Sequence, residues 1–414
     1  MTKVLFVSRA VPYANGRGIE RRAALHLSYL TQIGAVTLVV PVESVIDASN
    51  AGFRPDGLNV DQLIIRQEAT QAEVSVSNYV NARNIVSKFW YGLRLRYWID
   101  QTALPADSQR YHAVFGGDYD LLFAFRLSSA VWANSIFPPE STSPRIRIVD
   151  FDDLESQAFQ RSRVDTSRSP TRRYTDWRSY NWLKRTEREI ASAWTKTVVC
   201  SSVDAAQIKK ISGNNALILP NSVKFADPIP QHSASPHEVL FVGTLNYPPN
   251  AEGLKWFLYR VWPRVSQGLQ GSVKLKVVGI DAAADLVAIL ARAGACFLGR
   301  VESIEDEYVK CAVAIAPIFS GGGTRIKIIE AFSFTRAVLT TSVGCEGLDL
   351  VPGRDAIVAD TPEEFSSNLI TLIGDPQLRQ RIAEAGWHFG KQRFSIDSVR
   401  AQARDQIAAL MARR

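Results

Sequence analysis

The sequence lacks the features of a membrane-spanning, secreted or metal-binding chain. Its longest apolar run, Cys311–Phe319, is far shorter than the roughly 20 residues of a spanning helix. The short apolar run at the N-terminus has no small-residue cleavage site, so we expect no signal peptide. The four cysteines form no CxxC pair and lie in apolar stretches, which predicts reduced, buried thiols. The five histidines form no HExxH pair, so we predict no metal site.

The positive charge is unevenly distributed. The net charge is +7, and the segment Arg161–Arg188 alone holds nine basic and three acidic residues. A local basic excess favours a surface for anionic lipid or substrate, and no nucleic-acid-binding module is visible. The basic segment Arg161–Arg188 and the basic, aromatic segment Lys88–Trp98 have two possible interpretations. One is contact with an anionic membrane that carries a lipid-linked acceptor, and the other is a solvated helix face with an aromatic core stripe.

The first half of the chain begins as a parallel α/β sheet. A strand at Val4–Ser8 is followed by a glycine-containing loop at Tyr13–Gly18, a helix at Ile19–Gln32 and a strand at Val36–Val40. We predict further strands at Asp120–Phe125, at Arg145–Phe151 and, as the last strand of this half, at Thr197–Ser201, with helical inserts at Asn81–Trp98 and after Pro170.

The second half repeats the pattern after a proline-rich linker, Pro220–Pro236. We predict strands at Glu238–Val242, Val273–Val278, Ala295–Gly299, Cys311–Ile318 and Ala337–Thr341, and helices at Gly253–Val265, Asp281–Gly294, Ile326–Phe334 and Pro376–Arg414. The predicted fold is α/β, with two Rossmann-like doubly wound parallel sheets facing across a cleft. The domains are 1–222, 237–393 and a C-terminal helix, 394–414, that can pack back on the N-terminal domain.

The segment Ser320–Glu330 is the most informative in the chain. It reads SGGGTRIKIIE, between an apolar strand and a helix. Glycines at such a turn allow close approach of the backbone to a ligand, and the helix N-terminus attracts anions. Arg325 and Lys327 add positive charge, and Glu330 can accept hydrogen bonds from sugar hydroxyls. This combination suits a nucleoside diphosphate sugar.

Other nucleotide-binding signatures are missing. No GxxxxGK[ST] loop is present, and the first strand–helix turn, Ser8–Gly18, does not contain GxGxxG, which disfavours a nicotinamide dehydrogenase. The alternative without a ligand is a glycine-rich turn before a core helix, with Lys327 and Glu330 paired at i,i+3.

Four ordered motifs in the second half carry a resemblance to a known family. LFVGTLNYPPNAEGLKWF, VVGID, FLGRV and APIFSGGGTRIKIIEAFSFTRAVLTTSVGCEGL resemble the donor domain of family 4 retaining glycosyltransferases with the GT-B fold, over about Glu238–Arg393. The N-terminal half is less similar, and its IVDFDDLESQ (Ile148–Gln157) resembles a branch that acts on bacterial surface polysaccharides.

The resemblance implies roles for individual residues. Glu330 matches the second glutamate of the family's E-x7-E motif, which binds the donor ribose, whereas Gly322 stands at the position of the first glutamate. The stretch Gly299–Val301 matches the one whose backbone contacts the nucleobase. Thr244 stands where the family has an arginine, so Arg325 and Lys327 are expected to replace the diphosphate clamp. The predicted donor-binding residues are Gly16, Gly18, Gly243, Thr244, Arg300, Val301, Gly322, Gly323, Thr324, Arg325, Lys327 and Glu330.

Catalysis is expected to need little from the protein besides charge stabilisation. In retaining enzymes of this type the leaving diphosphate can take the acceptor proton, and the protein stabilises charge on that group. Arg126 stands where many relatives have a histidine, and Asp152 is our candidate to orient the acceptor. For the acidic cluster Asp150, Asp152 and Asp153 the alternative is capping of the following helix. We expect no metal and no cofactor beyond the nucleotide-sugar co-substrate.

The expected function is transfer of a sugar from a nucleotide-sugar donor to a lipid-linked or polysaccharide acceptor in bacterial surface-glycan biosynthesis. The expected location is the cytoplasm, at the inner face of the plasma membrane. Two alternatives remain from the sequence: a sugar-nucleotide epimerase of the same fold, and a non-catalytic glycan-binding relative.

Overall fold

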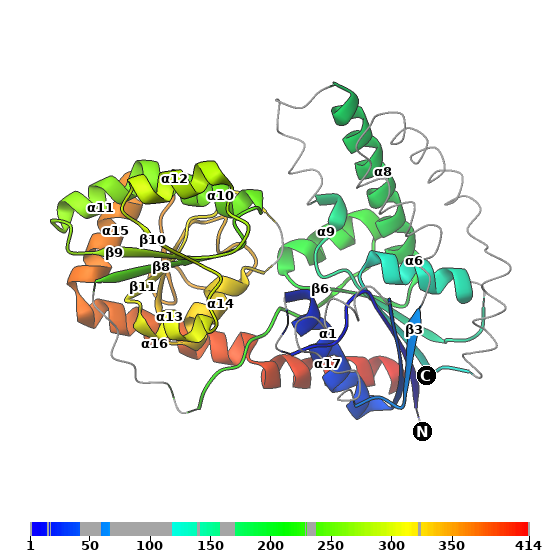
Figure 1. Ribbon diagram of the computed structural model, residues 1–414. Helices are drawn as coiled ribbons and strands as arrows, with labels where there is room; N and C mark the ends of the chain where they lie inside the picture. Colours follow the sequence, from blue (N-terminus) through cyan, green and yellow to red (C-terminus); the bar gives the residue numbers. More distant parts are fainter. Residues whose placement is uncertain are drawn as a thin grey trace. The chain divides into compact units, whose positions relative to one another are not determined.

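The computed structural model describes residues 2–14, 16, 18–41, 59–66, 118–138, 141–157, 170–227, 229, 237–321 and 324–412. The chain divides into two compact units, Met1–Leu219 with Arg400–Arg414, and Pro220–Val399 (Figure 1). The predicted helix at Asn81–Trp98 and the start of the basic segment, including Arg161, lie outside the described residues. No helix in the described ranges is long and apolar enough to cross a membrane.

The first unit contains a parallel sheet. Across it, the strands of the described residues follow the order β3 (Gln62–Arg66), β2 (Ala35–Pro41), β1 (Lys3–Ser8), β4 (Leu121–Phe125), β5 (Ile146–Asp150), β6 (Lys196–Val199) and β7 (Leu217–Ile218). Each pair of neighbours is parallel. The central strands are buried along nearly their whole length, as expected where helices cover both faces of a sheet.

Helices form a layer on each face of this sheet. One layer is formed by α1 (Gly18–Ile33) and the later part of α17 (Ile396–Ala412), and the other by α6 (Leu127–Ile136), α8 (Pro170–Ala193) and α9 (Ser202–Ser212). The aromatic stripe of α8 is only partly in the core, because Leu183 is buried and the Trp177 side chain is 49% exposed.

The second unit has the same strand order. Its described strands follow one another as β10 (Cys296–Gly299), β9 (Lys274–Val278), β8 (Glu238–Val242), β11 (Val313–Ala316), β12 (Ala337–Thr340) and β13 (Ile357–Val358), all parallel to their neighbours. In both sheets the order reverses beside the first strand, between β1 and β4 and between β8 and β11. Ligands of doubly wound sheets bind at such a reversal, at the carboxyl ends of the strands.

Helices cover both faces of the second sheet as well (Figure 1). One layer contains α10 (Pro248–Trp256), the π-helix η2 (Phe257–Val261), α11 (Trp262–Gly268), α12 (Ala284–Arg292) and α15 (Pro362–Gly374); the other contains α13 (Ile304–Lys310), α14 (Ile326–Ser333) and α16 (Pro376–Phe394). Gly253 lets α10 lie directly on the end of β11, because a Cβ there would be 1.7 Å from the carbonyl oxygen of Pro317.

Several sequence predictions need correction. Thr197–Ser201 is not the last strand of the first unit, because β7 follows at its edge. The predicted helix at Gly253–Val265 is three consecutive segments, with a π-helical turn between α10 and α11. The predicted C-terminal helix is two helices that meet at Ser395, whose backbone is extended. Finally, Cys296 is exposed, although all four cysteines were expected to be buried.

Candidate functional site

Two groups of predicted site residues lie at the reversals of strand order, one in each unit. In the second unit, Gly243 follows β8 directly, and the segment from Pro317 to Arg325 joins β11 to α14. A doubly wound sheet places these two connections side by side at its carboxyl edge. The structure thus brings together predicted donor-binding residues that are about eighty positions apart in the sequence. A hydrogen bond between Lys327 and Asn250 connects the two segments.

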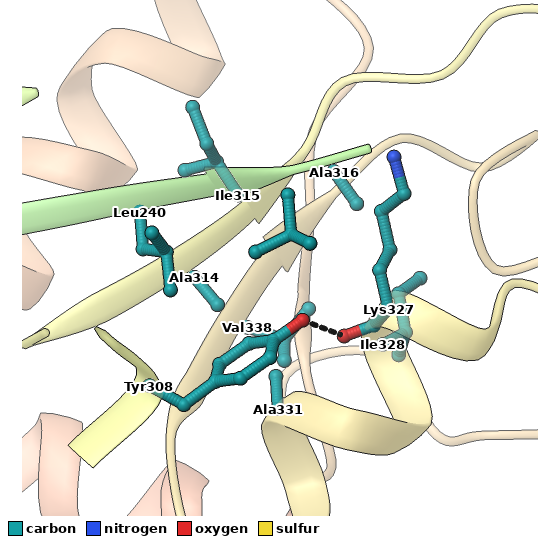
Figure 2. A pocket seen from close by; sticks show the side chains of 10 residues that line it. Leu240, Tyr308, Ala314, Ile315, Ala316, Lys327, Ile328, Ala331 and Val338 are labelled. Carbon is teal, nitrogen blue, oxygen red and sulfur yellow. Dashed lines mark hydrogen bonds between the residues drawn. The ribbon is translucent and has the colours of Figure 1, made fainter. Parts of the chain in front are cut away.

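Lys327 extends from α14 toward the end of β8. Its ammonium donates a hydrogen bond of 2.7 Å to Oδ1 of Asn250 and lies 4.6 Å from the ring centre of Phe241. Figure 2 shows this side chain directed away from Tyr308, whose hydroxyl donates to the backbone carbonyl of Lys327 at 3.1 Å. A Cβ on Gly243 would lie 2.9 Å from the ammonium, so the ammonium reaches the first residue after the strand.

The surroundings of Lys327 disfavour its charged form. Desolvation by burial, followed by the positive charge of Arg325, lowers its pKa from 10.5 to about 7, and Glu330 acts in the opposite direction. The sequence offered Glu330 as the partner of Lys327, whereas in the structure Asn250 accepts the hydrogen bond of the ammonium. A lysine with this pKa exchanges a proton readily near neutral pH.

The start of α14 presents a second cation. Arg325 is the residue before the helix, and its side chain is buried, as is that of Thr324. A Cβ on Gly321 would be 3.6 Å from Nη2 of Arg325, so the guanidinium lies beside the glycine-rich turn. Gly322 and Gly323 fall outside the described residues. A buried guanidinium next to a helix N-terminus forms a strongly anion-attracting position.

The other predicted donor residues surround this edge of the sheet. Glu330 is partly buried one turn further along α14, and Thr244 is exposed after β8. Arg300 is exposed and Val301 partly buried, directly after β10, where Gly299 has a φ of 64°. The carboxyl edge of the second sheet therefore carries the predicted diphosphate, ribose and base contacts together.

The predicted glycines of the first unit lie at the start of α1. Gly18 is the first residue of that helix, and the amide of Gly16 donates to the carbonyl of Tyr13 at 3.1 Å. A Cβ on Gly16 would collide with the carboxylate of Glu20, so a larger residue cannot occupy the turn in this conformation.

The two predicted catalytic residues form an ion pair in strained backbone. Nη2 of Arg126 lies 2.8 Å from Oδ2 of Asp152, at the carboxyl ends of the neighbouring strands β4 and β5. Both residues are in left-handed conformations, with φ of 78° and 58°. Such conformations cost about 1–3 kcal/mol for residues with a Cβ and cluster at functional sites. The sequence singled out both residues, and the structure joins them.

A buried polar network supports this pair. Asp150 accepts hydrogen bonds from Nε and Nη2 of Arg22, at 2.8 and 3.1 Å, and lies 2.5 Å from Nε2 of His26. The hydroxyl of Tyr29 lies 2.6 Å from Nδ1 of His26. Burial lowers the pKa of His26 and so favours the neutral form of the ring, which lies between Asp150 and Tyr29. Arg22 also reaches Asp152 at 3.5 Å, which links the network to the Arg126 pair.

The roles predicted for the acidic cluster must be divided. Asp150 neither faces an acceptor nor caps a helix, because it is fully buried against Arg22 and His26. Asp153 accepts a hydrogen bond from the Cys200 thiol at 3.5 Å. Burial, followed by the charge of Asp152, raises its pKa to about 6. Asp152, Asp153 and Cys200 are close enough to share a metal ion, but hydrogen bonds and the Arg126 pair already account for their arrangement.

Sequence reasoning missed Arg22, His26 and Asn250. Arg22 and His26 stand four residues apart on α1, a spacing that places both on one helix face, and this was the available signal. Asn250 follows two prolines at the start of α10, where it reads as an ordinary helix-opening residue.

The two parallel sheets covered by helices match the GT-B fold of solved glycosyltransferase structures. Among solved structures, sucrose-phosphate synthase from Thermosynechococcus elongatus is 14% identical, with a TM-score of 0.67 and 100% of both chains covered. Anabaena HepE, in a complex with UDP and glucose, is 13% identical, with a TM-score of 0.61, 99% of this chain covered and 100% of that one. At such identities these similarities show the fold alone.

Sequence comparison places a known domain on the second unit. Residues 236–375 match the family model described as glycosyl transferases group 1. A Klebsiella pneumoniae protein, described as an uncharacterized 44.6 kDa protein in the cps region, is 25% identical over 228 residues, which are 52% of this chain. The match spans 57% of that relative's length. The narrower assignment to family 4 stays a prediction.

Proposed function

We propose that this chain is a retaining glycosyltransferase that transfers a sugar from a nucleotide-sugar donor to a lipid-linked or polysaccharide acceptor in bacterial surface-glycan biosynthesis. One observation carries the proposal. Two cations, Arg325 and Lys327, meet a glycine-rich turn and a helix N-terminus at the strand-order reversal of a group 1 glycosyltransferase domain. This arrangement suits the diphosphate of a nucleotide sugar.

The remaining donor contacts are proposed from the resemblance to family 4 glycosyltransferases. Glu330, one turn beyond the cations, accepts hydrogen bonds from the ribose hydroxyls, and the backbone after β10 at Arg300 contacts the base. The complex of the similarly folded HepE with UDP and glucose supports a nucleotide donor for this fold.

In the first unit, we propose Arg126 as a catalytic residue that stabilises negative charge developing in the transition state. The side chain of Asp152 fixes the guanidinium by their 2.8 Å ion pair. The leaving group takes the acceptor proton, so the proposed reaction requires no metal ion and no resident cofactor.

The acceptor and the location are proposed from two further observations. The relative from a Klebsiella cps region supports a role in surface glycans. The basic segment Arg161–Arg188, with the exposed Trp177 in its described part, suits the anionic inner face of the plasma membrane. Co-sedimentation with anionic and neutral vesicles tests this contact, and equal binding to both would contradict it.

The test of the proposed function uses a panel of nucleotide sugars. We expect binding or slow hydrolysis of at least one donor, and transfer when an acceptor extract is added. Arg325→Ala should weaken donor binding by about 10- to 100-fold, since charge-assisted hydrogen bonds contribute about 1.5–3 kcal/mol. The control Arg264→Ala removes an exposed pair with Glu363 and should change little. A folded protein that binds no donor contradicts the proposal, and turnover without any acceptor would indicate an epimerase.

A further inference from the structure

The side-chain amide of Asn250 links the turn after β8 to α14. Its amide nitrogen donates to the carbonyl of Thr244 at 2.9 Å, and its Oδ1 accepts from the Lys327 ammonium at 2.7 Å. Only one orientation of the amide satisfies both bonds, since the carbonyl needs a donor and the ammonium needs an acceptor. Asn250 is itself buried. It therefore fixes the ammonium relative to the turn that follows β8.

The groups around this ammonium favour a neutral amine while the site holds no anion. Desolvation by burial is the largest cause, Arg325 adds a like charge, and Glu330, on the same helix, opposes both. Among the described residues, α10 supplies the uncharged amide of Asn250 and β8 the uncharged ring of Phe241. From α13, the hydroxyl of Tyr308 donates to the backbone carbonyl of Lys327. A bound diphosphate would supply the missing negative charge and reverse this balance.

We propose that Asn250 is a positioning residue that holds the side chain of Lys327 at Gly243, so that the Lys327 amine takes up a proton from solvent when the donor diphosphate binds. The inference rests on the proposed function. A neutral amide suits this task better than a carboxylate. A carboxylate would keep the amine permanently charged and would compete with the diphosphate for it.

The experiment is calorimetric titration of the full-length protein with UDP-glucose and GDP-mannose. Their diphosphates are diesters that do not titrate near neutral pH, so any proton exchange belongs to the protein. Measured at pH 8 in two buffers with different ionisation enthalpies, the wild type should take up about one proton per nucleotide sugar bound. At pH 6 it should take up almost none. Affinity should fall about tenfold from pH 7.5 to 8.5.

The variants separate positioning from folding. Asn250→Asp should abolish proton uptake at pH 8 and flatten the pH dependence of affinity, whereas the control Asn368→Asp, on the exposed side of α15, should leave both unchanged. If Asn250→Asp fails to fold, Lys327→Arg gives an independent result. Because arginine stays charged, any nucleotide sugar that this variant still binds should be bound without proton uptake, whatever its affinity.

The outcomes distinguish the two proposals. Donor binding without proton uptake by the wild type, or full uptake by Lys327→Arg, overturns this inference and leaves the proposed function intact. The same titration extends to every nucleotide sugar of the panel, and absence of binding by all of them at either pH contradicts the proposed function and this inference with it.

Discussion

Arg126 and Asp152 show what single residues contribute to this molecule. Each adopts a backbone conformation that costs free energy for a residue with a Cβ, and each side chain is held by the other. The surrounding network of Arg22, Asp150 and His26 is buried, so the positions of both side chains are strongly constrained. Rigid placement of a cation is what electrostatic stabilisation of a developing negative charge requires.

We predict that Asp152→Asn lowers turnover by about 10- to 100-fold, because the fixed position of Arg126 is lost. Asparagine tolerates the left-handed conformation, so the fold should remain and the melting temperature should change little. The measurement is steady-state transfer with a donor identified from the panel. Asp120→Asn is the control, since Asp120 is an aspartate at the opposite end of the same sheet, where it accepts from the Lys3 amide. Equal loss of activity in both variants would contradict a specific role for Asp152.

At the scale of elements, close packing at the carboxyl edge of the second sheet fixes the geometry of the donor site. α10 carries Asn250 and is in direct contact with the segment after β11 through Gly253. A change at that contact should therefore act on both stability and donor binding.

Gly253→Ala should destabilise the second unit by about 1–3 kcal/mol, the usual cost of overpacking. The added Cβ would lie 1.7 Å from the Pro317 carbonyl oxygen, which cannot move away without shifting the end of β11. Chemical denaturation measures the effect. Gly374→Ala is the matched control, because a Cβ there meets nothing within 4 Å. Similar destabilisation by both substitutions would rule out the contact as the cause.

Glu187 on α8 makes the stability of the first unit depend on pH. Burial raises its pKa from 4.5 to about 7, although the carboxylate accepts hydrogen bonds from the amide and hydroxyl of Ser156. The folded state therefore binds this proton more tightly than the unfolded state does. Its contribution to the free energy of unfolding falls as pH rises from about 4.5 to 7 and is constant above that range.

Glu187→Gln should remove this pH dependence. Between pH 5 and 8 the free energy of unfolding of the variant should therefore fall by about 2–3 kcal/mol less than that of the wild type. Denaturation at a series of pH values measures it. Glu189→Gln, an exposed neighbour paired with Arg185, should retain the wild-type profile. An unchanged slope in Glu187→Gln would refute the assignment.

At the scale of the whole molecule, the chain passes from the second unit back into the first within α17. Its residues from Arg400 onward belong to the first unit, where Ala403 and Ile407 are fully buried in the core beside α1. The C-terminus is thus structurally part of the N-terminal unit.

Ile407→Ala should destabilise the first unit by about 2–5 kcal/mol. Hydrogen exchange should report lower protection in β1 and β4, with β8 and β11 unchanged. Arg404→Ala, at an exposed position of the same helix, serves as the control. Loss of protection in the second sheet instead would contradict the packing of Ile407 in the first unit.

The sequence alone determined the central strands of both sheets and the glycine-rich turn before α14. These depend on local patterns: buried strands read as apolar runs, and a glycine-rich turn before a helix is visible within a dozen residues. The edge strands β3, β7 and β13, the helices α6, α9 and α15 and the π-helical turn were not predicted.

Only the tertiary structure decided how the site residues act. Lys327 meets Asn250 across 77 positions, and Arg22 meets Asp150 across 128, because the reversal of strand order brings distant connections to one edge. The pKa of Lys327 likewise depends on burial and on neighbours contributed by three elements, which no local pattern records. The residue types of the proposed diphosphate site are therefore written in the sequence, and the pKa of Lys327 follows from the fold.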